Sequence, residues 1–165
     1  MKVIAIDAST KSTGVAFFDG KELVDYVCIT AGSSDLIKRI QKIVGELHIF
    51  LSKYKVEKII LEEVRPENGL QNIKTHRALM WLQAAIAFLV HEQHPHAVIE
   101  YVYPSEWRAA CGIKNGRGVR RETQKANDIL FVKNNYGIEV NDDIADAIGI
   151  GHAYVNQLTN EMNWE

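Results

Sequence analysis

Short apolar runs separated by turn residues open the chain, and this pattern constrains the fold more than any other feature of the sequence. Residues 2–7 (KVIAID) are rich in β-branched side chains and are followed by a polar turn. Asp19 and Gly20 lie between two further apolar runs, at 14–18 and 22–29, which is a strong hairpin signal. We therefore predict that three antiparallel strands open the chain.

The spacing of apolar residues changes to three and four from residue 36 onward, which predicts an amphipathic helix that Ser34 could cap. Because crossovers between parallel strands are right-handed, the later apolar runs should form strands parallel to the first one. The predicted class is α/β, with a mixed sheet and helices on both faces. The remaining predicted elements are strands at 58–64 and 97–103, a basic loop at 112–118 and helices at 73–91, 119–134 and 142–159.

A chain of 165 residues, 47% of them apolar, is long enough for one good core, so we expect a single domain over residues 1–165. No apolar run approaches the roughly 18 residues that a membrane span requires. Charges at Lys2 and Asp7 argue against a signal peptide and favour a cytoplasmic protein. The distant Cys28 and Cys111 exclude a paired-cysteine zinc site and are expected to be reduced.

Acidic residues end two of the predicted strands. Asp7 closes the first strand, and Glu62 and Glu63 close the strand at 58–64. An acid in such a place is often only a solvated strand boundary. Two acids on neighbouring parallel strands, however, meet at the edge of the sheet where α/β proteins place their ligands.

The last predicted helix carries three acids whose positions around the helix differ. With 100° per residue, Asp143 falls inside the apolar arc and Asp146 borders it, whereas Asp142 lies on the polar side. We interpret Asp142 as a solvated first-turn acid. An unpaired carboxylate on a buried face costs several kcal/mol, so Asp143 and Asp146 should share a cation, most simply a metal ion.

A site made of carboxylates alone favours Mg²⁺ or Mn²⁺ over zinc. Two such ions about 4 Å apart can activate a water and stabilise the leaving oxygen of a phosphodiester. The acids therefore point to metal-dependent phosphodiester hydrolysis, without a small-molecule cofactor.

Three blocks, IDASTKSTGVA at 6–16, IILEEV at 59–64 and DIADAIGIG at 143–151, resemble conserved blocks of the RuvC family of Holliday junction resolvases in order and spacing. The sequence PSEWRAACGI at 104–113 resembles the phage-encoded branch of that family, which would place the protein in a bacterial host cell. The resemblance implies a ribonuclease H-like fold, a homodimer and a Mg²⁺-dependent site in each subunit that nicks four-way DNA junctions. It also selects Glu62 over Glu63, so that the expected catalytic and metal-binding residues are Asp7, Glu62, Asp143 and Asp146.

A basic segment at 108–125 contrasts with the overall net charge of -2. It holds six basic residues and one acid, and its glycines allow backbone to approach phosphate closely, with Trp107 anchoring it to the body of the protein. We expect branched DNA to bind there. The resemblance supports the same surface, and Arg65 stands where bacterial members have an aromatic wedge, so the expected DNA-binding residues are Arg65, Arg108, Lys114, Arg117, Arg120, Arg121 and Lys125.

Several alternatives remain open at this stage. The DASTKSTG turn also resembles the phosphate loop of actin-like sugar kinases, but a kinase of that kind needs a second lobe. A related nuclease acting on RNA–DNA hybrids or flaps is the main alternative, and a non-catalytic DNA-binding module is another. The largely apolar helix at 73–91 is covered either by a long loop or by a second copy of the chain.

Overall fold

A computed structural model describes residues 1–64 and 73–161 of the chain, with side chains as far as Gln157. Its strands and helices follow the predicted order, with one additional short helix after the last strand. The elements are β1 (Lys2–Asp7), β2 (Ser12–Asp19), β3 (Glu22–Thr30), α1 (Leu36–Ser52), β4 (Lys58–Glu62), α2 (Ile73–Gln93), β5 (Val98–Val102), α3 (Pro104–Ala110), α4 (Arg121–Tyr136) and α5 (Asp142–Glu161).

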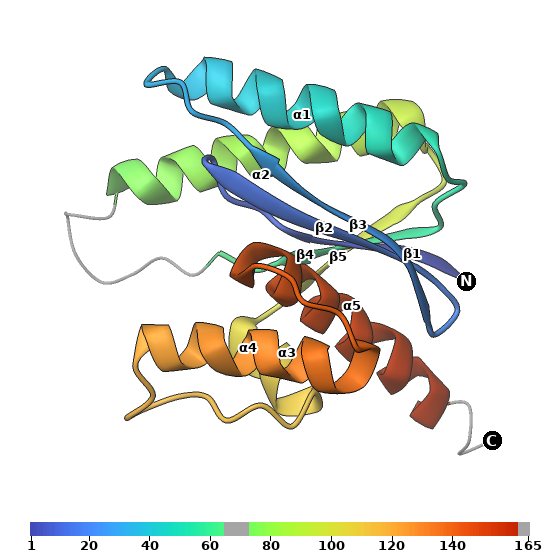
Figure 1. Cartoon of the computed structure of the whole chain (residues 1–165). Helices are drawn as coiled ribbons and strands as arrows, with labels where there is room; N and C mark the ends of the chain where they lie inside the picture. Colours follow the sequence, from blue (N-terminus) through green and yellow to red (C-terminus); the bar gives the residue numbers. More distant parts are fainter. Residues whose placement is uncertain (65–72, 162–165) are drawn as a thin grey trace.

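The five strands form one mixed sheet in the order β3-β2-β1-β4-β5 (Figure 1). The first three strands are antiparallel, while β4 runs parallel to both β1 and β5. Both predictions of strand direction are therefore confirmed. In the parallel register Ile6 lies beside Leu61, so Asp7 and Glu62 follow as the last residues of neighbouring strands.

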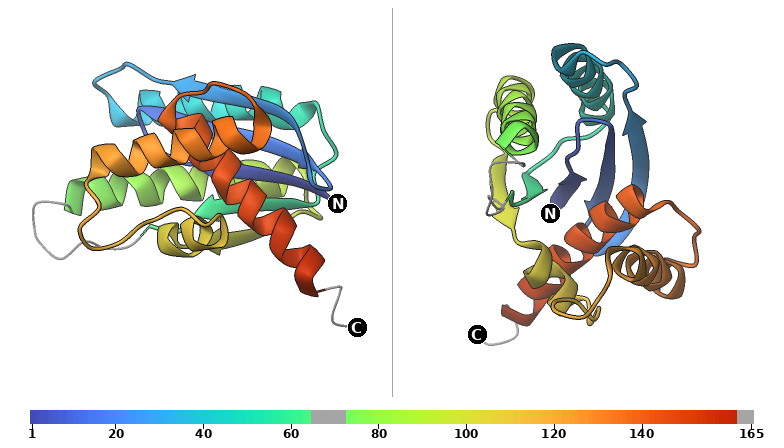
Figure 2. Two further views of the ribbon diagram at one scale, coloured as in Figure 1. Left: turned by 60° about the horizontal axis from the view of Figure 1, so that its bottom comes forward. Right: turned by 90° about the vertical axis from the view of Figure 1, so that its left-hand side faces the viewer.

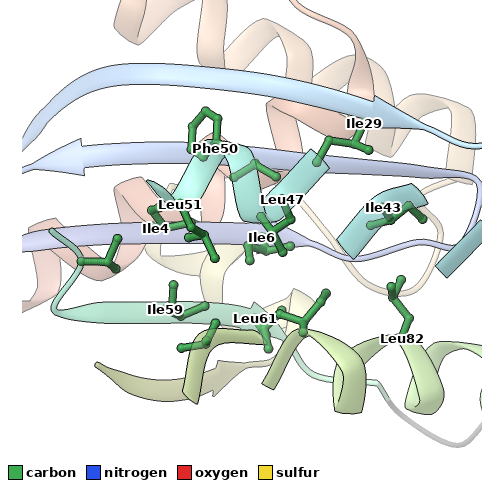
Figure 3. Close-up of a cluster of buried hydrophobic side chains, with 14 of the residues drawn as sticks. Ile4, Ile6, Ile29, Ile43, Leu47, Phe50, Leu51, Ile59, Leu61 and Leu82 are labelled. Carbon is green, nitrogen blue, oxygen red and sulfur yellow. The ribbon is translucent and has the colours of Figure 1, made fainter. Parts of the chain in front are cut away.

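Helices cover both faces of the sheet, as predicted. Figures 1 and 2 show α1 and α2 on one face and α3, α4 and α5 on the other. The core under α1 and α2 combines residues from alternate strand positions, such as Ile4, Ile6 and Ile59, with Leu47 and Leu82 from the helices (Figure 3). The opposite sides of β1 and β2 contribute to a second core under α5, so both strands are buried on both faces.

Helix α5 packs directly on β2 because glycines leave room for it. A Cβ atom added to Gly14 would lie 1.9 Å from the carbonyl oxygen of Asp143, and one added to Gly151 would lie 2.2 Å from the Phe18 ring. No side chain fits at these positions without a shift of the helix. The contact fixes the first turn of α5 against the end of β2 that lies nearest Asp7.

Two local predictions were wrong. Asp35, and not Ser34, caps α1, because the Asp35 Oδ1 atom accepts a 3.0 Å hydrogen bond from the amide of Lys38 in the first turn. Pro104 ends β5 as expected, but it also begins the unpredicted helix α3, since proline suits the first position of a helix. Among the described residues, no helix is long and apolar enough to cross a membrane.

Candidate active site

Asp7 and Glu62 are the last residues of the adjacent parallel strands β1 and β4, and they therefore lie at the same edge of the sheet. Figure 2 shows the sheet from this side in its right-hand view. Burial raises the pKa of Asp7 well above its ordinary value, and the neighbouring charges of Glu62 and Asp143 raise it further. Burial also raises the pKa of Glu62, whose Oε2 atom accepts a 2.8 Å hydrogen bond from the Trp107 indole. The ends of β1 and β4 thus hold two neighbouring acids where water solvates them poorly.

The first two turns of α5 carry three further acids, Asp142, Asp143 and Asp146. Asn141 caps the helix, because its Oδ1 atom accepts a 2.9 Å hydrogen bond from the amide of Ile144. Asp143 accepts a 2.5 Å hydrogen bond from the Ser12 hydroxyl, which belongs to β2. Asp142 points elsewhere and pairs with Lys125 on α4, so it is an ion-pair partner and more than a solvated first-turn acid.

Asp146 is the acid whose environment is least favourable to a negative charge. Burial, followed by the charges of Asp7 and Asp128, raises its pKa to about 10. Its Oδ1 atom is buried and receives no hydrogen bond from a donor in the described residues. Its Oδ2 atom lies 3.5 Å from the Arg108 guanidinium. Asp146 therefore has an unused oxygen ligand within the acidic cluster.

These residues fit a divalent cation in their chemistry, although they are not arranged as a finished coordination shell. Within the described ranges, no three His, Cys, Asp or Glu side chains converge as the ligands of one ion. Glu62, Asp143 and Asp146 are instead turned toward Trp107, Ser12 and Arg108. The ligands are all oxygen, one buried oxygen is unpartnered and the acids repel one another, and each of these features favours Mg²⁺ or Mn²⁺. The ligand set itself stays a prediction.

A buried ion pair that sequence reasoning missed supports the cluster from α3 and α4. The Arg108 guanidinium donates two hydrogen bonds from Nε and one from Nη2 to the carboxylate of Asp128, whose side chain is 1% exposed. Arg108 was predicted to contact DNA, yet its side chain is only 15% exposed and lies between Asp128 and Asp146. The signal in the sequence was weak: Asp128 precedes the buried Val132 by one helical turn.

The neighbouring Trp107 supports the other side of the cluster. Its ring is fully buried, as its predicted anchoring role requires, and its indole reaches Glu62. A Cβ atom added to Gly149 on α5 would lie 2.5 Å from this ring, so the glycine makes room for it. Two consecutive residues of α3 thus contact two different acids, Trp107 contacting Glu62 and Arg108 contacting Asp146.

The other predicted DNA-binding residues differ in how free their side chains are. Lys114, Arg117, Arg120 and Arg121 are exposed along the loop before α4 and at the start of that helix. This loop contains Gly112, Gly116 and Gly118 at positive φ, a conformation that other residues rarely adopt. Lys125 is held by Asp142, and Arg65 lies outside the described residues. Their contacts with DNA stay predictions.

Solved structures with the same architecture cover almost the whole chain. Thermus thermophilus RuvC in complex with a Holliday junction substrate matches with a TM-score of 0.73 and 16% identity, over 98% of this chain and 96% of that one. The chain has the ribonuclease H-like fold of RuvC. The RuvC fold is shared at lower similarity by the yeast mitochondrial Holliday junction resolvase Ydc2, with a TM-score of 0.60 and 16% identity over 98% of this chain and 82% of that one.

The fowlpox virus resolvase, solved with Holliday junction DNA, also matches the RuvC fold of this chain. Its TM-score is 0.56 at 16% identity, over 96% of this chain and 99% of that one. No protein-family model and no curated protein matches the sequence. The fold expected from the three sequence blocks is therefore confirmed through structure, at a level of identity where sequence alone shows little.

Proposed function

We propose that this protein is a Holliday junction resolvase, a metal-dependent endonuclease that nicks four-way DNA junctions. The observation that carries the proposal is the convergence of partly buried acids from three separate elements, β1, β4 and α5, at one edge of a RuvC fold. Three of the solved proteins with this fold are Holliday junction resolvases, and two of them were solved with junction DNA.

The acids have defined roles in this proposal. Asp7, Glu62, Asp143 and Asp146 would hold two Mg²⁺ ions, or Mn²⁺ in their place. When bound, such ions would supply an activated water and stabilise the departing oxygen. Trp107 orients Glu62 through its indole hydrogen bond, and Ser12 orients Asp143 through its hydroxyl. The exposed cations of the basic segment bind the phosphates of the junction arms.

Cleavage of three substrates tests the proposal. A four-way junction, a flap and an RNA–DNA hybrid are each incubated with Mg²⁺ and either wild type or Asp143→Asn. We expect nicks in the junction at symmetric positions and a rate at least about 100-fold lower for the variant, because one ligand charge is lost. Asp142→Asn is the matched control, since Asp142 is engaged by Lys125 and is not one of the proposed ligands. If the protein cleaves the hybrid or the flap faster than the junction, the proposal that its substrate is a four-way junction is wrong.

We also propose that a second copy of the chain packs on α2, so that two sites face one junction. Trp81 and Phe88 lie seven positions apart on the same side of this helix, and they are 48% and 73% exposed. They are therefore not core residues, and loops in the described part of the chain leave them uncovered. Exposed aromatic side chains in one stripe are typical of a protein interface.

Light scattering tests this second proposal. Phe88→Glu should shift the measured mass from dimer to monomer, because burying a charge in an apolar interface costs several kcal/mol. Val24→Glu is the control, since Val24 is 49% exposed on the edge strand β3. In junction cleavage, Phe88→Glu should reduce the fraction of junctions nicked in both strands more than the rate of single nicks. A wild-type mass of one chain at micromolar concentration would contradict the proposal.

A further inference from the structure

A groove beside the acids contains basic side chains that the basic segment does not include. It has a volume of about 590 Å³ and lies between the β1–β2 turn and the first turns of α1, α2 and α4. Among the residues that the structure describes, eleven line it; four of these are basic and none is acidic. The basic residues are Lys11, Arg39, Lys74 and Arg121.

The groove begins next to the site. Ala8, which follows Asp7 directly, is one of its lining residues, and the hydroxyl residues Ser9 and Thr10 continue it. The turn that carries them is held in place by the buried Thr13, whose hydroxyl donates a 2.7 Å hydrogen bond to the Ser9 carbonyl and accepts one from the Ser9 amide. This wall of the groove is therefore a defined surface and not a set of free side chains.

Arg39 forms a fixed part of another wall. Its Nη1 atom donates hydrogen bonds of 2.9 and 3.2 Å to the carbonyl oxygens of Ser33 and Ser34. The guanidinium makes no ion pair with an acid in the described residues, so none of those acids neutralises its charge. Lys11 and Lys74 are exposed at the groove. Neither lysine forms an ion pair with an acid among the described residues.

The charges around the site are therefore distributed on two sides of Asp7. Lys114, Arg117 and Arg120 lie on the side of α3 and α4, whereas Lys11, Arg39 and Lys74 lie on the side of α1 and α2. Arg121 stands at the start of α4 and also lines the groove, so it joins the two groups.

We propose that this groove binds the sugar–phosphate backbone of the strand that is cut, on the opposite side of the scissile bond from the basic segment. A strand held on both sides of the acids cannot slide or rotate away from them, which is the positioning that phosphodiester hydrolysis requires. Hydroxyls, lysines and a guanidinium are groups that contact phosphate without reading base sequence. The inference rests on the proposed function for its substrate, since it assigns the path of that strand.

Salt-dependent binding tests the groove. The double variant Lys11→Ala/Lys74→Ala is compared with Lys21→Ala/Lys55→Ala, which removes the same charge at the opposite end of the sheet. Binding to a four-way junction is measured by fluorescence anisotropy in EDTA, so that no cleavage occurs. The groove variant should lower the slope of log affinity against log salt by about 1 for each lysine. Its affinity at about 0.1 M salt should fall at least tenfold.

The control variant should bind within about twofold of wild type, because its lysines lie far from the acids relative to a Debye length of about 10 Å. An equal loss in both variants, or an unchanged slope in the groove variant, would overturn the assignment. Binding of ATP or inorganic phosphate that depends on Lys11 and Lys74, with junction affinity unchanged, would also overturn it, because the groove would then hold a small phosphate ligand.

Cleavage kinetics separate this inference from the proposed function. If wild type cleaves junctions, the groove variant should raise KM with a smaller effect on kcat, and unchanged KM would overturn the groove alone. If wild type instead cleaves hybrids or flaps, a flattened salt slope on that substrate still supports the groove, although the proposed function has failed. If wild type binds no DNA, both are wrong.

Discussion

At the scale of single residues, the site depends on how its charges are neutralised inside the protein. Asp128 is nearly inaccessible and its charge is matched by Arg108, which also approaches Asp146. A buried pair of this kind contributes little net stability when intact, but removing one partner leaves an uncompensated charge. The pair therefore acts mainly by fixing Arg108, and through it the surroundings of Asp146.

Asp128→Asn should destabilise the protein by about 3 kcal/mol, because the buried guanidinium loses its counter-charge. Urea unfolding followed by circular dichroism measures this change. Glu139→Gln is the matched control, since it removes an acid from the exposed pair with Lys133 near the end of the same helix and should change stability little. Equal effects of the two substitutions would show that Arg108 does not depend on Asp128.

The pKa values of Asp7, Glu62 and Asp146 predict how pH and metal act together. Burial raises all three, so the folded protein binds protons more tightly than the unfolded chain does. Their contribution to stability is present below the unfolded pKa of about 4 and is lost as pH rises through the folded values. A divalent ion bound as proposed should reverse this loss, because it would bind the ionised acids.

Melting temperatures with EDTA and with several millimolar Mg²⁺ measure this linkage. The increase caused by Mg²⁺ should be larger at about pH 8.5 than at about pH 5.5, where more of the acids stay protonated. Asp7→Asn together with Asp146→Asn should remove most of the increase at both values. An increase that is independent of pH would mean that Mg²⁺ binds elsewhere.

At the scale of elements, α5 delivers acids to the site because glycines let it lie against β2. Gly14→Ala should destabilise the protein by about 3 kcal/mol or more, since the added Cβ meets a backbone oxygen that cannot turn aside. Cleavage should also fall, because the helix moves Asp143 and Asp146 away from Asp7. Thermal unfolding and junction cleavage are the measurements.

Gly45→Ala is the control for Gly14→Ala in thermal unfolding, and we expect it to stabilise the protein. Gly45 is exposed in the middle of α1, and nothing lies within 4 Å of a Cβ atom added there. The substitution should stabilise the helix by about 1 kcal/mol, because alanine restricts the unfolded chain and favours helix. If both glycine substitutions had the same sign, close packing would not explain Gly14.

The strands and long helices could be predicted from the sequence because each has a regular apolar pattern. Helix α3 was not predicted, since a helix of seven residues that begins at a proline is too short to show a helical period. The partners of the acids were missed for another reason, which is their distance along the chain. Arg108 and Asp128 are 20 positions apart, and Ser12 and Asp143 are 131 positions apart, so only the folded arrangement brings them together.

At the scale of the whole molecule, the acids could be predicted from the sequence, whereas the cations of the groove could not. Helix phase selected Asp143 and Asp146, both of which lie at the acidic edge, while Lys125 and Arg108 turned out to be engaged by acids. The cations of the groove come from β1–β2, α1, α2 and α4, and no local run of charge marks them. A surface assembled from four separate segments has no signature in one stretch of sequence.

The packing of α5 on β1 and β2 also has a consequence for how the protein is made. This helix covers one face of the central strands and carries the last two of the four acids. A nascent chain that has not yet extended to residue 146 therefore has an open apolar sheet face and lacks two of the four proposed metal ligands. If the four acids act together as proposed, a chain truncated before residue 146 should not cleave DNA.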